Sequence, residues 1–239
     1  MIVIKDRFLI FMHIPKTAGS TLNKLFQKQY KQEELLIHLP EKQLKEKLQQ
    51  NPSGLKGIGG HYEFGLHKYI TKPVSYFSMV RDPVDRIISL YYFLSTSPDY
   101  ILYEKLKETS LEQFIDENKQ VGNHQTLFFS SGGKVDLDEA IENIEKYFSI
   151  VGVTNRFNES IYLMKKEFGW EDLSYQKVNV TKKRPSLKEV PTDIIQKIKE
   201  KNELDIKLYE YVNKRLSKQV KLLTREEQAE IKKNNQQAQ

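Results

Sequence analysis

The chain has 239 residues, a formal net charge of +6 and no cysteine. This length suits one α/β domain with a sizeable core, and the lack of cysteine excludes disulfide frameworks, cysteine–metal sites and cysteine nucleophiles. No apolar run approaches the ~20 residues that cross a bilayer, and the opening MIVIKDRF is too short for a signal peptide. We therefore expect a soluble, cytoplasmic protein.

The excess positive charge is spread along the chain rather than clustered. Lys and Glu alternate along helical stretches such as 41–50 and 191–216, a pattern typical of solvated faces. No motif that reads DNA or RNA is present. The charge therefore suits an anionic ligand, and we expect no nucleic-acid partner.

The first motif follows a predicted buried strand, Phe8–Met12. The next segment, His13–Thr21, reads HIPKTAGST and leads into apolar residues at helical spacing. A strand, a tight loop and a helix present backbone N–H groups to an anion. Lys16 adds a mobile charge, and Gly19 allows close backbone approach. The motif predicts a phosphate loop, but one that differs from the NTPase pattern G-x-x-x-x-G-K-[ST], because its lysine precedes the glycine by three residues.

The second motif follows another predicted strand, Val74–Val80. Asp82 and the proline after it suit the start of a helix, so Arg81 ends the strand and Ser89 lies about two helical turns further on. An arginine and a hydroxyl in this arrangement can hold one phosphate together. The alternative is an ordinary strand–turn–helix in which Arg81 pairs with Asp82 or Asp85.

Strands and helices alternate through the rest of the chain. Further strands are expected at 34–38, 56–60 and 148–153, and helices at 43–49, 100–107, 137–147 and 161–168. This alternation predicts an α/β fold with a parallel sheet, helices on both faces and ligands beyond the carboxyl ends of the strands. Residues 224–239 are polar and lack aromatic residues, so we expect a helical or disordered tail after a domain of residues 1–223.

Together, the two motifs resemble the phosphosulfate loop and the 3′-phosphate element of sulfotransferases that use 3′-phosphoadenosine 5′-phosphosulfate (PAPS). The likeness is greatest to the carbohydrate branch, sulfotransferase family 2, which includes the heparan sulfate 2-O-sulfotransferases. PKTAGST resembles the PKT-led loop of that branch, and VRDPVDRIISLYYF resembles its RDPxxRxxSxYYF element. Two weaker similarities to the same family follow at Ile150–Trp170 and Asn179–Pro185. The resemblance implies a three-layer, P-loop-like sulfotransferase fold and, because animal members carry a membrane anchor that is not seen here, a bacterial enzyme.

The resemblance also implies the donor site. Lys16 would stabilise the leaving phosphate, and the loop amides would hold the 5′-phosphate of PAPS. The resembling family needs no magnesium, and no acidic cluster suited to it is seen, so no metal is expected. The expected donor-binding residues are Pro15, Lys16, Thr17, Ala18, Gly19, Ser20, Thr21, Arg81, Ser89, Thr181, Lys182, Lys183 and Arg184.

The resemblance favours His61 as the general base. His61 stands at a predicted strand end behind two glycines, and a histidine is suited to accept a proton near neutral pH. The alternative is a core histidine whose polar atoms the backbone satisfies. Gly59 stands where the heparan sulfate enzymes carry a further histidine, so their uronic-acid specificity is not implied.

The acceptor site is expected at a polar segment that opens an apolar run, Asn123, His124 and Gln125. A plain helix start explains these residues equally well, and His124 is the next candidate for the base. The resemblance favours a saccharide or glycolipid acceptor, while phenols and peptides stay open. Two other functions stay open as well, a P-loop kinase-like phosphotransferase and a non-catalytic nucleotide-binding module.

Overall fold

The computed structural model describes residues 7–100, 103–176 and 184–237. At its centre is a five-stranded sheet in the order β2-β3-β1-β4-β5, in which every neighbouring pair is parallel. The strands are largely apolar and buried, as expected for a parallel sheet that helices cover on both faces. They are β1 (Phe8–Met12), β2 (Leu35–Ile37), β3 (Gly57–Gly60), β4 (Val74–Val80) and β5 (Phe148–Val153).

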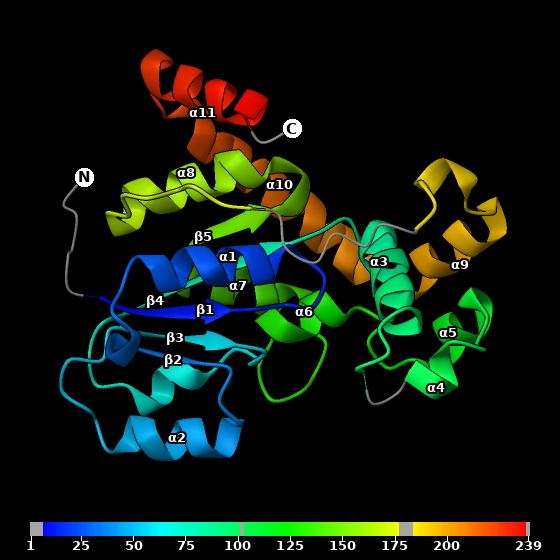
Figure 1. Cartoon of the computed structure of the whole chain (residues 1–239), viewed down its shortest axis with the longest axis horizontal. Helices are drawn as coiled ribbons and strands as arrows, with labels where there is room; N and C mark the ends of the chain where they lie inside the picture. The colour runs from blue at the N-terminus through cyan, green and yellow to red at the C-terminus, as the bar shows by residue number, and fades with distance from the viewer. Residues whose placement is uncertain (1–6, 101–102, 177–183, 238–239) are drawn as a thin grey trace.

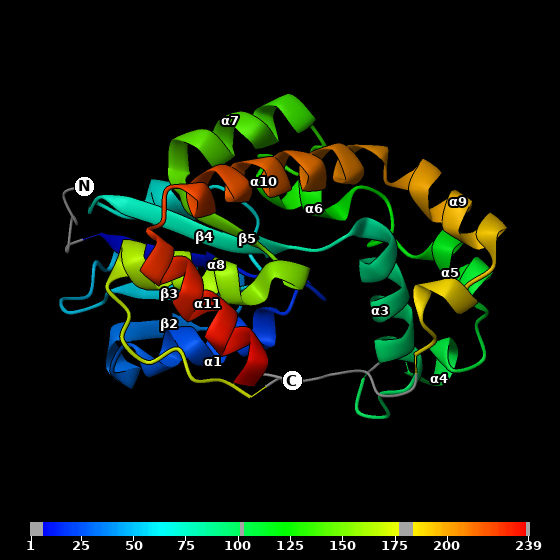
Figure 2. The same cartoon turned by 90° about the horizontal axis from the view of Figure 1, so that it is seen from above.

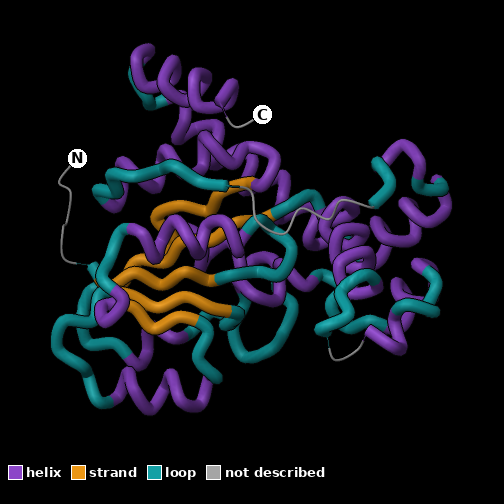
Figure 3. The backbone as a smooth tube through the Cα atoms, viewed as in Figure 1, coloured by secondary structure: helices purple, strands orange, loops and turns teal. Residues whose placement is uncertain are grey.

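Helices pack on both faces of the sheet, which confirms the predicted three-layer α/β architecture (Figures 1 to 3). One face is covered by α1 (Gly19–Lys28) and α8 (Phe157–Phe168). The other is covered by α6 (His124–Phe129), α7 (Leu137–Tyr147) and α10 (Glu203–Lys221). Helix α2 (Glu41–Gln49) lies beside the β2 edge (Figure 1). Short 3-10 turns are η1 (Gln32–Glu34), η2 (Leu66–Tyr69), η3 (Thr154–Arg156) and η4 (Leu187–Glu189).

A helical lobe lies beyond the carboxyl ends of the strands, on the right of Figure 1. It comprises α3 (Pro83–Ser95), α4 (Tyr103–Leu106), α5 (Leu111–Glu117) and α9 (Thr192–Lys201). The lobe has its own apolar core, in which Ile87, Phe114 and Ile198 are fully buried. Because α3 begins directly after β4, the carboxyl edge of the sheet faces this lobe across the region that holds the site.

The C-terminal helix α11 (Arg225–Gln237) packs on α8. Its Ile231 is buried, and Glu227 accepts an ion pair from Lys166 at 2.7 Å. The described part of the tail is therefore a helix in contact with the α/β layers, while a domain boundary at residue 223 stays a prediction. Within the described ranges, none of the helices has the length and apolarity to cross a membrane.

The predicted elements differ from the observed ones mainly at their ends. The helix expected at 161–168 begins earlier, at Phe157, and the one expected at 100–107 is the short α4. Asn158 and Glu159 are polar residues in the first turn of α8, so apolar periodicity gives no signal there. The weaker strand predictions at 34–38 and 56–60 were each longer than the strands β2 and β3.

Candidate functional site

The loop after β1 makes a tight turn directly into α1. Lys16 (φ 68°) and Ala18 (φ 66°) both adopt the left-handed conformation, which costs a non-glycine residue about 1–3 kcal/mol. The Thr17 hydroxyl donates to the carbonyl of Ile14 at 2.9 Å and holds the turn. Left-handed residues in such turns aim backbone N–H groups at a common point and form a nest for an anion. The predicted phosphate loop thus has a backbone suited to that role.

Gly19 begins α1 where the helix approaches the end of β1. A Cβ atom built on Gly19 would lie 1.8 Å from Cδ2 of the His13 ring. Any other residue would therefore displace the histidine. The close contact observed at Gly19 is thus with a side chain of the same loop, and close approach of its backbone to an anion stays a prediction.

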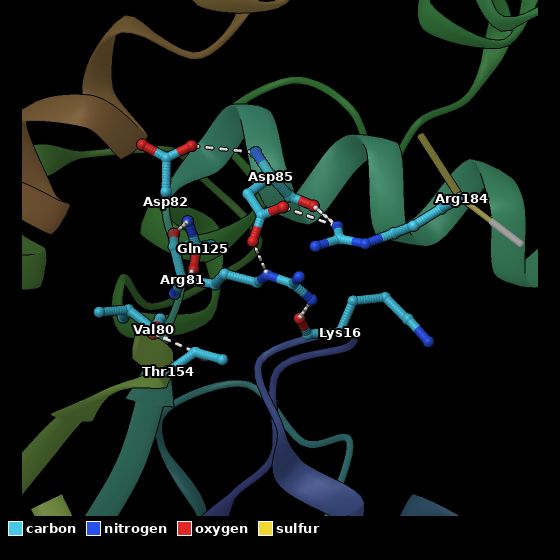
Figure 4. Close-up of polar contacts among 8 residues, drawn as sticks. All are labelled: Lys16, Val80, Arg81, Asp82, Asp85, Gln125, Thr154 and Arg184. Carbon is cyan, nitrogen blue, oxygen red and sulfur yellow. Dashed lines mark hydrogen bonds and ion pairs between the residues drawn. The ribbon is translucent and has the colours of Figure 1, made fainter. Parts of the chain in front are cut away.

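The carboxylate of Asp85 binds two arginines beside the phosphate loop (Figure 4). Asp85 accepts from Nε of Arg81 at 2.6 Å and from a guanidinium nitrogen of Arg184 at 2.6 Å. Arg81 also donates to the carbonyl of Lys16 at 3.0 Å, so it ties the second motif to the first. The alternative pairing of Arg81 with Asp85 is thus real, and it coexists with a place beside the phosphate loop.

The backbone of Arg81 is clamped by Gln125. The Gln125 amide accepts from the Arg81 N–H and donates to its carbonyl, both at 2.9 Å. The backbone N–H groups of Gln125 and Thr126 in turn donate to the carboxylate of Asp205 on α10, at 3.0 and 2.7 Å. The clamp fixes where the end of β4 points and thereby where Arg81 lies.

Lys16 is held away from water before any ligand binds. Its Nζ lies 3.8 Å from the centre of the Phe93 ring. Burial, with smaller effects from Arg81 and Arg184, lowers the pKa of Lys16 to about 8. A charge placed among other cations in this way is stabilised when an anion arrives.

Three histidines meet at the ends of neighbouring strands. His61 Nδ1 lies 2.7 Å from the carbonyl oxygen of His13, and because that oxygen can only accept, Nδ1 carries the proton and Nε2 keeps its lone pair. The ring of His61 lies 4.2 Å from that of His13 and 5.6 Å from that of His38, between ring centres. Burial, and less strongly His38, lowers the pKa of His61. His61 is therefore neutral at pH 7 and can accept a proton.

A further histidine, His124, lies near both Arg86 and His61. Burial, with Arg86 and His61, lowers the pKa of His124 to about 3, so its imidazole stays neutral. Arg86 is completely buried and donates to the carbonyl of Gln120 at 2.5 Å. Arg86 has no exposed surface with which to touch a ligand in this conformation.

A cavity of about 740 Å³ joins these groups. The predicted site residues in its lining are Pro15, Lys16, Ala18, Gly19, Ser20, Thr21, His61, Arg81, Ser89, His124 and Arg184. Thr17 is buried behind the loop. The residues Thr181, Lys182 and Lys183 lie outside the described residues, so the structure does not test them.

Two predicted acceptor residues have structural roles instead. The side chain of Asn123 accepts from the backbone N–H groups of Leu204 and Asp205 at 2.9 and 3.1 Å, at the start of α10. Gln125 is fully buried in the clamp on Arg81. The sequence did not distinguish these roles, because both depend on α10, which is far away along the chain. Neither Asn123 nor Gln125 lines the cavity.

Several cavity residues were missed by the sequence analysis. Thr154 follows β5 directly and donates to the Val80 carbonyl at 3.1 Å; its place at a strand end could have identified it. Phe157 and Tyr175 also line the cavity and meet edge to face, with their ring centres 4.9 Å apart. The remaining lining is largely apolar or aromatic: Leu90, Phe93, Leu94, Tyr100 and Phe128, with Glu63, Gln120 and His13.

The chain is similar to known sulfotransferases. Human galactose-3-O-sulfotransferase 3 is 22% identical over 245 residues, which covers 87% of this chain and 56% of that protein. Heparan sulfate 2-O-sulfotransferase 1 of Xenopus laevis is 27% identical over 119 residues, covering 43% and 32% of the two chains. The solved structure of mouse sulfotransferase SULT7A1 complexed with PAP matches at a TM-score of 0.43 and 12% identity, over 71% of this chain and 61% of that one.

The chain spans about half the length of the galactose-3-O-sulfotransferases that it matches. The sequence profile described as "Sulfotransferase family" matches residues 1–212, which includes both motifs and every strand of the sheet. As the two motifs predicted, the chain belongs to the sulfotransferase family.

Proposed function

We propose that the protein transfers the sulfuryl group of PAPS to a hydroxyl group of a carbohydrate. The observation that carries this proposal is that one cavity joins a phosphate loop, two arginines and a neutral histidine. The loop and the arginines supply positive charge for a donor with two phosphate ends, and the histidine supplies a base. No observation on the described residues favours a kinase-like or non-catalytic function over this one.

The two ends of the donor are assigned to the two motifs. The turn at Lys16 to Thr21 receives the 5′-phosphosulfate, where backbone N–H groups and the helix terminus favour an anion. Arg81 and Ser89 receive the 3′-phosphate, and Arg184 adds charge from the same side. The rings of Phe157 and Tyr175, which meet edge to face, offer an aromatic surface for the adenine of PAPS.

His61 and Lys16 then assist a single displacement reaction at the sulfur atom of PAPS. His61 Nε2 takes the proton of the acceptor hydroxyl while its Nδ1–H stays bonded to the His13 carbonyl. The acceptor oxygen forms the new bond to sulfur, and the bond from sulfur to the bridging oxygen of the 5′-phosphate breaks. Lys16 stabilises the negative charge that develops on that leaving oxygen. The products are the sulfate ester and PAP, and the proton stays on His61 until water removes it.

A saccharide acceptor is supported by the relatives, whose names specify galactose and heparan sulfate. The lining of the cavity includes Phe93, Tyr100 and Glu63. Aromatic faces with a carboxylate nearby suit a sugar, whose C–H face packs on rings and whose hydroxyls donate hydrogen bonds. The expected cytoplasmic location stays a prediction, which fractionation of the producing cells tests.

The test is a transfer assay with sulfur-labelled PAPS against sugars, glycolipids and phenols, run on wild-type protein and on His61→Ala. Loss of a positioned base should reduce transfer by roughly 10²–10⁴-fold, while PAP affinity stays near the wild-type value because the imidazole faces the acceptor. The matched control is His67→Ala, since His67 lies in η2 and packs on Tyr147. A folded His61→Ala protein with wild-type turnover would exclude His61 as the base. If the wild-type protein binds PAP but transfers sulfate to no sugar, glycolipid or phenol, the result would contradict the proposed activity.

A further inference from the structure

Three neighbouring strands each end in a histidine. His13 follows β1, His38 follows β2 and His61 follows β3. In the sheet, β3 lies between the other two, and the parallel register pairs Met12 with Gly60 and Ile37 with Gly59. This register brings the three imidazoles to one edge of the sheet, although they are far apart in sequence.

The ring nitrogens of the three histidines are close enough to share one ion. A nitrogen from each of His13, His38 and His61 lies within 4.8 Å of the others. Tetrahedral Zn²⁺ with bonds of 2.0–2.1 Å brings its nitrogen ligands to about 3.3 Å from one another. Since His38 and His61 are exposed, small rotations of their side chains toward His13 can close the difference of up to about 1.5 Å.

His13 contributes a buried ring with one nitrogen that has no partner in the described part of the chain. Its side chain is 6% exposed, and Nδ1 is buried with no hydrogen-bond partner among the described residues. A buried polar atom without a partner costs about 1–3 kcal/mol, and an ion is one of the few explanations for such an atom. Histidine is the commonest protein ligand of zinc-like metals.

The surroundings of the other two histidines fit metal ligands as well. The hydrogen bond from His61 Nδ1 to a backbone carbonyl fixes the tautomer in which Nε2 carries no proton. Histidines bound to metals usually make such a bond with the other ring nitrogen. The side-chain amide nitrogen of Asn23 lies 3.2 Å from His38 Nε2, while its amide oxygen is buried with no partner among the described residues. Rotating the amide by 180° exchanges the two atoms, so that the oxygen accepts the Nε2 proton and leaves Nδ1 for a metal.

We propose that His13, His38 and His61 bind one divalent metal ion of the Zn²⁺, Co²⁺ and Ni²⁺ class, and that the bound metal switches off sulfuryl transfer. Imidazole ligands select this class over Mg²⁺ and Ca²⁺. The metal engages the same lone pair on His61 Nε2 that accepts the acceptor proton. The binding step is independent of the proposed function, whereas the inhibitory step rests on it. This proposal departs from the sequence expectation that no metal binds, which is itself still a prediction.

The binding step is tested with metal-free full-length protein and Co²⁺ as the probe. Bound at three imidazoles, Co²⁺ in a four-coordinate site gives an intense visible absorption, and Zn²⁺ added afterwards should abolish it at one equivalent. His38→Gln should weaken Co²⁺ binding by at least about 100-fold, the upper range for the loss of an outer partner of a ligand. His67→Gln, outside the cluster, should bind like wild type. Equal binding by wild type and His38→Gln, or only the weak spectrum of hydrated Co²⁺, would overturn the site.

The inhibitory step is tested by transfer assays at increasing free Zn²⁺, each variant compared with its own metal-free rate. Wild type should lose activity in proportion to the occupancy measured with Co²⁺, and His38→Gln should need at least about 100-fold more Zn²⁺ for the same fractional loss. A rate that stays constant or rises as the site fills would overturn the inhibitory role. If no acceptor is found, the proposed function fails, but the spectroscopic result still decides the metal site.

Discussion

The depressed pKa of Lys16 makes a quantitative prediction about donor binding. In the free protein this pKa is about 8. Bound phosphates should return it toward the usual value of about 10.4, since an anion favours the charged form. In the free protein, Lys16 is therefore roughly nine-tenths charged at pH 7 but only about one-tenth charged at pH 9. The phosphates of PAP, with a second pKa near 6, are at least about nine-tenths ionised over the same range.

The dissociation constant of PAP should therefore rise about tenfold between pH 7 and pH 9, and binding at pH 8 should take up about half a proton. Calorimetric titration in buffers of different ionisation enthalpy measures both quantities. Lys16→Met keeps the length and apolar stem of the side chain but has no charge to lose, so its PAP affinity should not depend on pH in this range. A flat wild-type profile, or an equal slope in Lys16→Met, would refute the reasoning.

Three further predictions concern the walls of the same cavity. Arg81→Ala should weaken PAP by about 1.5–3 kcal/mol more than adenosine 5′-phosphosulfate, which lacks the 3′-phosphate; equal losses in calorimetry would make Arg81 structural. Tyr175→Ala should cost about 1–3 kcal/mol of PAP affinity if the ring stacks on the base, whereas Tyr175→Phe should not, and equal affinities for all three proteins would remove Tyr175 from the site. Gly19→Ala should lower the free energy of unfolding in urea by about 1–3 kcal/mol, because its Cβ would overlap the ring of His13. The control Gly122→Ala has its nearest neighbour at 3.6 Å and should change little; equal effects at both glycines would contradict the steric argument.

The local parts of the site could be predicted from the sequence. The strands Phe8–Met12 and Val74–Val80 were predicted with the observed bounds, because a buried strand needs only a short apolar run with turn residues at its ends. The cap at Asp82 was also predicted, and its carboxylate accepts from the N–H of Asp85 at 2.9 Å. The phosphate loop and the arginine after β4 are encoded within a few residues of these strands.

The long-range parts of the site could not be predicted in this way. The pairing of Asp85 with Arg184 joins segments 99 positions apart. The histidine cluster depends on β3 lying between β2 and β1, an order that differs from the order along the chain. Periodicity reports how one segment is buried, but it does not report which strand lies beside which.

The clamp on Arg81 makes the second motif depend on a residue outside both motifs. The carboxylate of Asp205 binds the backbone of Gln125, whose side chain binds the backbone of Arg81. A truncated form of this chain that stops before α10 would keep both motifs but lose this carboxylate. Its Arg81 would then lack the support that fixes its position beside the phosphate loop.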